Sequence, residues 1–158
     1  PKALMSTPRG HANHALYLAR VLLQAWERER QAENLPASLL AQAFGPAARE
    51  HLLNAYGWCL LHLQQPAQQP PQLPHCVADL PPTAPGKAQP AEIDEFARLE
   101  VEGWLTVLLR EPGLEPVRRS VGNLAASASG LPDAEALQQV ANHLEAAFSR
   151  VGDALDEC

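Results

Sequence analysis

Residues 47–63, with the sequence AAREHLLNAYGWCLLHL, constrain the fold more than any other stretch of the chain. Their large apolar side chains recur at spacings of three and four residues, which places them on one face of an α-helix. These side chains are Leu52, Leu53, Tyr56, Leu60 and Leu63. The pattern predicts the most buried helix of the protein, with the remaining elements packed against it.

The rest of the 158-residue chain also favours helices, because helix-forming residues are frequent and β-branched and aromatic residues never alternate over a useful length. Apolar periodicity predicts further helices over residues 7–33, 36–44, 91–111, 115–126 and 132–155. We therefore expect an all-α fold without a β-sheet, a four-to-five-helix bundle in which residues 1–158 form a single domain. Within it, residues 1–7 are expected to be disordered or derived from a tag, and residues 156–158 to form a flexible tail.

Several prolines stand at the starts of these helices, where a missing N–H costs nothing. Thr7 is the expected N-cap of the first helix and Pro8 its first residue. The short connection at residues 34–36 predicts that the first two helices form an antiparallel hairpin. At Pro46 we expect a break or sharp kink, because proline removes an N–H and clashes with the preceding turn. The second helix would then be a bent arm.

Residues 64–90 form a linker rich in proline and glutamine between the second and third main helices. An extended polyproline conformation rises about 3.1 Å per residue, so the linker spans roughly 80 Å and can return to either end of the bundle. The direction of the third helix relative to the second therefore stays open. Leu73, Val77 and Leu80 are candidates to hold the middle of the linker against the bundle.

Two glycines, Gly57 and Gly103, each precede a tryptophan inside a predicted helix. A glycine within a helix costs about 1 kcal/mol relative to alanine, so two such glycines indicate a close approach of backbones. We interpret both Gly-Trp pairs as core packing.

Charge and cysteine content exclude several classes of function. A formal net charge of −6 argues against general nucleic-acid binding and against anionic membranes, because both need clustered Lys and Arg. Three cysteines without a CxxC pair indicate neither a disulfide framework nor a zinc site. The sequence contains no Glu-x-x-His motif, which a di-iron bundle would need. No secretion signal and no bilayer-spanning stretch is present. We expect a cytoplasmic protein without metal or cofactor.

The segments HANHALYLARVLLQAW (residues 11–26) and REHLLNAYGWCLLHL (residues 49–63) resemble a family of small all-helical bacterial proteins of unknown function. The similarity extends over the whole chain. It implies an all-helical fold, and it implies no functional residue, because the matching motifs are of the core type.

The first functional hypothesis is a non-enzymatic cytoplasmic adaptor or regulatory protein that binds a protein partner or forms a homodimer. No catalytic set is assembled in the sequence, since there is no G-x-S-x-G motif and Cys59 lies among apolar residues. The candidate partner-binding residues come from the acidic start of the third helix and from the linker: Glu92, Asp94, Glu95, Pro70, Pro71 and Leu73. The acidic residues also suit the dipole at a helix amino end, which is the structural alternative.

The second hypothesis is a small-molecule-binding protein or enzyme with a pocket between helices. Its candidate lining residues are four aromatic side chains and three histidines: Trp26, Tyr56, Trp58, Trp104, His14, His51 and His143. A third alternative is an unconventional nuclease. Asn13-His14 and Asn142-His143 are followed seven or eight residues later by Arg20 and Arg150, and these polar groups would meet if the terminal helices were adjacent.

Overall fold

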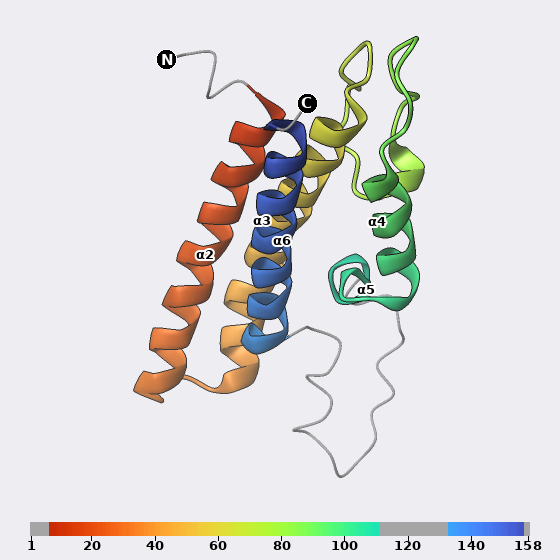
Figure 1. Cartoon of the computed structure of the whole chain (residues 1–158). Helices are drawn as coiled ribbons and strands as arrows, with labels where there is room; N and C mark the ends of the chain where they lie inside the picture. The colour runs from red at the N-terminus through yellow and green to blue at the C-terminus, as the bar shows by residue number, and fades with distance from the viewer. Residues whose placement is uncertain (1–6, 111–132, 157–158) are drawn as a thin grey trace.

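The computed structural model describes residues 7–110 and 133–156, and these residues form an all-α fold without a strand. Three long helices make up the main bundle: α2 (Pro8–Ala32), α3 (Ala37–Gln64) and α6 (Ala134–Asp156). The 3₁₀-helix η1 (Val77–Asp79), α4 (Ala91–Glu102) and the short α5 (Leu105–Leu109) pack beside them (Figure 1). The prediction of an all-α helical bundle is confirmed.

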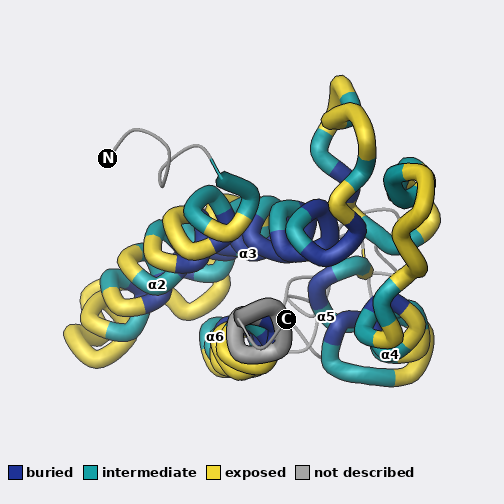
Figure 2. Tube along the Cα trace, turned by 45° about the horizontal axis from the view of Figure 1, so that its top comes forward, coloured by how far each residue is buried: buried dark blue, intermediate teal, exposed yellow. Residues whose placement is uncertain are grey.

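The helix α3 is the centre of the packing, as its periodicity predicts. It lies between α2 and the side formed by α4 and α5, and buried residues run along its length (Figure 2). Its five large residues that define the predicted apolar face are at most 6% exposed: Leu52, Leu53, Tyr56, Leu60 and Leu63. The first two helices form the expected antiparallel hairpin, and α6 runs parallel to α3 (Figure 1).

Local sequence signals explain the start of α2. The Thr7 hydroxyl accepts a hydrogen bond from the Gly10 N–H at 3.0 Å, and Pro8 is the first helical residue. Thr7 is therefore the N-cap, as predicted. The prediction that residue 7 belongs to a disordered or tag-derived segment is therefore wrong. Residues 1–6 lie outside the described residues.

Of the break or sharp kink expected at Pro46, the break is wrong, because α3 continues through this residue as one helix. The residue before a proline avoids the helical conformation mainly because its Cβ clashes with the proline ring. Gly45 has no Cβ, and a Cβ added there would lie 3.8 Å from the Trp26 ring. Pro46 is itself exposed, so the carbonyl that loses its N–H partner faces the solvent side. Together these features let the helix pass a residue that usually ends one.

The proline-rich segment between α3 and α4, residues 65–90, folds back so that α4 runs antiparallel to α3 (Figure 1). The outgoing and returning parts of the segment meet at an isolated bridge between Pro66 and Thr83, and the Gln64 side-chain amide donates to the Pro81 carbonyl at 2.9 Å. We call this segment the return loop. Its course settles the direction of the third main helix, which the sequence left open.

The third main helix is not continuous over residues 91–111, which corrects the prediction. It ends at Glu102, and Gly103 adopts an extended conformation before the chain enters α5. A Cβ on Gly103 would lie 2.5 Å from Leu99 Cδ2 and 2.9 Å from Leu99 Cα, so a side chain does not fit this corner. Gly103 therefore serves a chain reversal, not a contact between helices. Arg49 stabilises the corner by donating from Nε to the Leu108 carbonyl at 3.0 Å.

The start and end of α6 differ slightly from the prediction. The helix begins at Ala134, and the Asp133 side chain accepts a hydrogen bond from the Ala136 N–H at 2.7 Å, which makes Asp133 its cap. The helix includes Asp156, which corrects the prediction that the flexible tail begins at this residue. The predicted helix over residues 115–126 lies outside the described residues. Within residues 7–110 and 133–156, no helix is both long and apolar enough to cross a bilayer.

Candidate functional site

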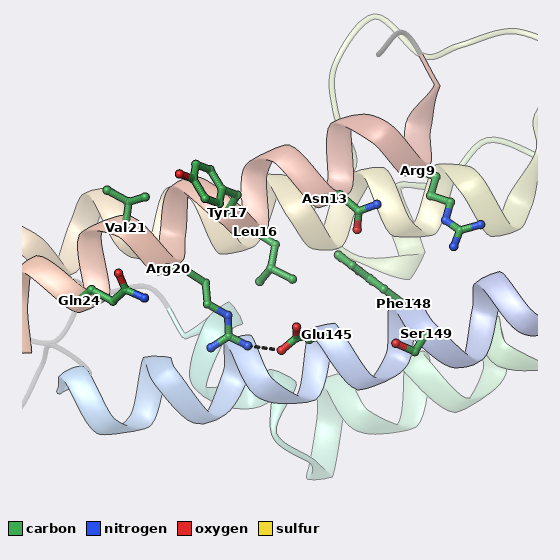
Figure 3. A pocket seen from close by; sticks show the side chains of 10 residues that line it. All are labelled: Arg9, Asn13, Leu16, Tyr17, Arg20, Val21, Gln24, Glu145, Phe148 and Ser149. Carbon is green, nitrogen blue, oxygen red and sulfur yellow. Dashed lines mark hydrogen bonds and ion pairs between the residues drawn. The ribbon is translucent and has the colours of Figure 1, made fainter. Parts of the chain in front are cut away.

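Two adjoining hollows follow the line where α2 and α6 meet, and together we call them the α2/α6 groove. The first hollow has a volume of about 510 Å³, and its floor is formed by Leu16 and Phe148 (Figure 3). The second has a volume of about 670 Å³ and shares Gln24 with the first. The groove is open to solvent and extends over most of the length of α2.

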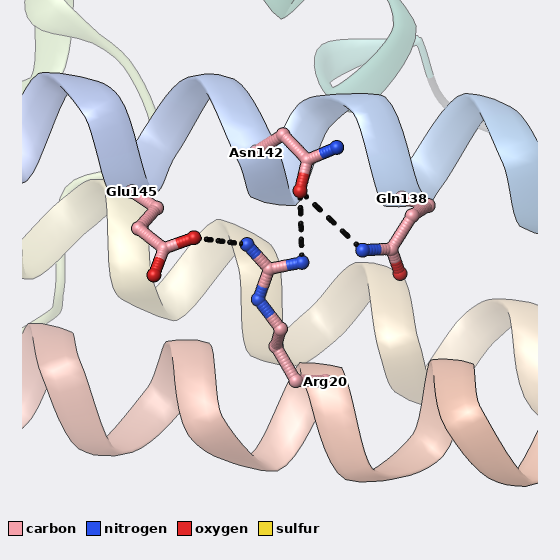
Figure 4. Close-up of polar contacts among 4 residues, drawn as sticks. All are labelled: Arg20, Gln138, Asn142 and Glu145. Atoms are coloured by element: carbon pink, nitrogen blue, oxygen red, sulfur yellow. Dashed lines mark hydrogen bonds and ion pairs between the residues drawn. The ribbon is translucent and has the colours of Figure 1, made fainter.

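A polar cross-link between α2 and α6 lies where the two hollows meet. The Arg20 guanidinium donates from Nη1 to Asn142 Oδ1 at 2.9 Å and from Nη2 to Glu145 Oε2 at 2.5 Å (Figure 4). Gln138 adds a long hydrogen bond of 3.4 Å to the same oxygen of Asn142. The Arg20 side chain is only 21% exposed. This charge-assisted fork therefore fixes the separation and register of the two helices.

Two large apolar side chains stand exposed beside this cross-link. Tyr17 is 64% exposed and Val21 is 44% exposed, and both line the first hollow (Figure 3). They are four residues apart on α2, so they form one continuous patch. Both side chains lie at the α2 edge of the groove, on the side of the helix away from α6 (Figure 3). An exposed apolar pair with polar groups around it is an arrangement found in protein–protein interfaces.

Charge is distributed unevenly along the groove. The first hollow is lined by two guanidinium groups and one carboxylate, and the second by one guanidinium group and three carboxylates. The residues are Arg9, Arg20 and Glu145 in the first hollow, and Arg30, Glu27, Asp133 and Glu135 in the second. One end of the groove is therefore positive and the other negative.

The aromatic and histidine residues predicted for a ligand pocket lie in separate places. Trp26 is 3% exposed and stacks on Phe44, and Tyr56 is fully buried. Trp58 stacks on His11 with ring centroids 4.4 Å apart. Among the seven residues, Trp104 and His143 are brought together, with their ring centroids at 5.0 Å.

The remaining two histidines of that set, His14 and His51, are exposed and half-buried respectively. Among the described residues that line the α2/α6 groove, none belongs to the predicted set of seven. The Arg20 to Asn142 contact shows that the terminal helices are adjacent, which the nuclease alternative required. His14 and His143 take no part in that contact.

The residues predicted for partner binding lie on α4 and the return loop. On α4, Asp94 is exposed, Glu92 is half-buried, and Glu95 forms an exposed ion pair of 3.4 Å with Arg150 of α6. In the return loop, Pro71 is exposed and Pro70 half-buried. Leu73 packs against the backbone of α3 at Gly57, where a Cβ would lie 2.8 Å from Leu73 Cγ. Leu73 is therefore used within the fold.

Cys59 lies in the core at 3% exposure, and this burial raises the pKa of its thiol to about 12. It is a neutral, buried thiol at physiological pH, as the apolar sequence around it predicts. Within the described residues, no group of three or more His, Cys, Asp or Glu side chains is placed to hold a metal ion.

The sequence analysis did not identify Tyr17 and Val21, the two exposed apolar residues that line the groove. The signal was present: both are large apolar residues four apart on α2, off the stripe formed by Ala12, Ala15 and Ala19. An apolar pair outside the core-facing stripe indicates a second contact surface.

No protein-family model matches the chain, and comparisons with curated proteins and with solved structures give no significant match. The resemblance to small all-helical bacterial proteins stays a prediction.

Proposed function

We propose that the chain acts through protein–protein interaction, as a helical adaptor or regulatory protein, and that the α2/α6 groove is its binding surface. The observation that carries this proposal is the exposed pair Tyr17 and Val21 at the edge of a groove whose two helices are held in register by Arg20. An exposed apolar pair has a cost in water that contact with a partner removes.

The shape of the groove favours a helix as the partner element. The helix α2 has 25 residues, so the groove beside it is of the order of 35 Å long. Amphipathic helices bind such grooves through apolar residues at intervals of three and four positions. The polar groups at the rim, including Asn13, Gln24 and Ser149, can align a bound helix through hydrogen bonds.

A photo-crosslinking amino acid at position 17 tests this proposal in cells that produce the chain. Position 42 supplies the control, because Gln42 is exposed on α3 and is not among the residues that line the groove. We expect a specific cross-linked product from position 17 and none from position 42, with the product reduced by Val21→Glu. The proposal is wrong if position 17 gives no product or if both positions give the same products.

The small-molecule hypothesis remains the second candidate, because the first hollow has a volume within the usual range of ligand sites, about 300–1,000 Å³. Its lining residues would be those of the groove and not the predicted aromatic set. A thermal-shift screen against a metabolite library distinguishes it from the first proposal, since a ligand in the hollow raises the melting temperature of the chain alone.

A further inference from the structure

The exposed face of α2 has the spacing of a helix that pairs with another helix. His14, Tyr17, Val21, Gln24 and Arg28 are all exposed and follow one another at intervals of three and four residues. This is the spacing of the seam in a pair of nearly antiparallel or parallel helices. The two large apolar residues occupy the middle of the seam and polar residues its ends.

We propose that the exposed face of α2, together with the adjoining edge of the α2/α6 groove, is covered by the α2 helix of a second copy of this chain, in a two-fold symmetric, antiparallel dimer. This inference rests on the proposed function, because it takes the groove as an interaction surface and names its partner. Tyr17 of each copy lies opposite Val21 of the other at the centre of the interface.

Charge selects this arrangement. A two-fold axis perpendicular to α2, through the point between Tyr17 and Val21, turns the second α2 end for end and keeps both α6 helices on the same side. The positive first hollow of each copy then lies beside the negative second hollow of the other. Arg9 and Glu27 line opposite ends of the groove, so each Arg9 faces the region of Glu27 in the other copy. The complementary contact occurs twice, whereas a parallel arrangement would bring like charges together.

The charged group at the centre of the groove already has hydrogen-bond partners within the chain. Arg20 is the charge nearest the apolar pair, and its guanidinium is already bonded to Asn142 and Glu145 of the same chain. Covering it with a second copy therefore leaves this guanidinium paired. A partner helix without the matching charge gradient would lack the contacts at the two ends.

The mass of the purified full chain, measured by analytical ultracentrifugation over a concentration series, tests the proposal. We expect a reversible monomer–dimer equilibrium that Val21→Glu shifts to monomer. Val101→Glu is the matched control, because Val101 is 80% exposed but lies on α4, outside the groove. It should leave the equilibrium unchanged. Circular dichroism establishes that each variant keeps its helical fold.

Charge reversal tests the antiparallel arrangement itself. Arg9→Glu alone and Glu27→Arg alone should each weaken dimerisation roughly tenfold, and the double variant should recover most of the loss, since it restores opposite charges at both ends. A double variant as weak as the single variants would contradict the antiparallel geometry.

Failure of this inference can be distinguished from failure of the proposed function. A purified chain that stays monomeric at all concentrations, while position 17 cross-links to a different protein in cells, overturns the dimer and leaves the groove as an interaction surface. A monomeric chain without a cross-link at position 17 overturns both. Equal effects of Val21→Glu and Val101→Glu also overturn the dimer.

Discussion

The Tyr56 hydroxyl donates a hydrogen bond of 2.6 Å to Glu100 Oε1, and this bond joins α3 to α4 in the interior of the protein. The same carboxylate oxygen accepts the backbone N–H of Val77 at 2.8 Å. One acidic group thus connects the central helix, the following helix and the turn of the return loop. Since Tyr56 is fully buried, its hydroxyl depends on this partner.

Replacing Tyr56 by Phe removes the hydroxyl while keeping the ring that packs against Phe96. We expect Tyr56→Phe to lower the free energy of unfolding by about 1–2 kcal/mol, because a charged acceptor loses a buried donor. Tyr17→Phe is the matched control, since Tyr17 is 64% exposed and its hydroxyl can bond to water. Urea denaturation measures both variants. Equal losses in the two would contradict a role for the Tyr56–Glu100 bond.

The same tyrosine gives an alkaline pH dependence. Burial, and then the hydrogen bond to Glu100, raises the pKa of the Tyr56 hydroxyl well above its ordinary value of about 10. The unfolded chain therefore loses this proton at a lower pH than the folded chain does. The contribution to stability is complete below about pH 10 and is lost as the pH rises beyond it.

The Tyr17→Phe variant isolates this effect, because the chain has two tyrosines and only Tyr56 then remains. We expect the ultraviolet absorbance of tyrosinate to appear together with the loss of helical circular dichroism. Tyrosinate that forms near pH 10 in a still helical protein would show that Tyr56 is accessible to water.

Gly57 lies where the return loop touches α3, so Gly57→Ala should destabilise the protein although alanine favours helices. A Cβ at this position would clash with the Pro74 carbonyl and approach Leu73 Cγ to 2.8 Å. Overpacking of this kind costs about 1–3 kcal/mol, against a gain of about 1 kcal/mol in helix propensity.

Hydrogen exchange at the Val77 amide reports whether Gly57→Ala displaces the loop, and denaturation gives the change in stability. Gln42→Ala, at an exposed position of the same helix, is the control and should be neutral or slightly stabilising. A Gly57→Ala variant more stable than the original chain would rule out close packing of the loop on α3.

The Arg20 cross-link between α2 and α6 should contribute more to stability than the ion pair within α2. Arg20→Ala removes two hydrogen bonds between helices, and we expect a loss of about 1 kcal/mol, reduced by partial exposure of Glu145. Arg20→Lys should restore little of it, because an ammonium group cannot reproduce the fork. Arg30→Ala is the control, since Arg30 pairs with Glu27 on the same exposed helix surface. A similar response of both variants to denaturant would argue against a special role for Arg20.

The parts of the fold that the sequence predicts are those set by local patterns. The apolar periodicity of residues 47–63 identifies the buried helix, and Thr7 with Pro8 identifies the start of α2. Gly45 explains why α3 does not break at Pro46: the clash that ends a helix before proline involves a Cβ that glycine lacks. The sequence contained this information, but a rule for proline alone does not use it.

Other features depend on contacts between distant segments and could not be predicted from local patterns. The direction of α4 follows from hydrogen bonds such as Gln64 to Pro81, and the corner at Gly103 follows from its fit against Leu99. The contact between α2 and α6 could not be predicted from local patterns either. The sequence indicates only that Arg20 and Asn142 would meet if the terminal helices were adjacent. Their actual partnership requires the register between α2 and α6, which no spacing within one helix specifies.

The adjacency of α2 and α6 has a consequence for the order of events during synthesis. Arg20 and Asn142 are 122 positions apart, so a ribosome releases the α2–α3 hairpin long before the helix that covers it. Until then Leu16, which lines the α2/α6 groove together with Phe148 of α6, has no α6 helix beside it. Contacts of such long range are slow to form. The core between α2 and α6 can therefore close only after α6 has been synthesised.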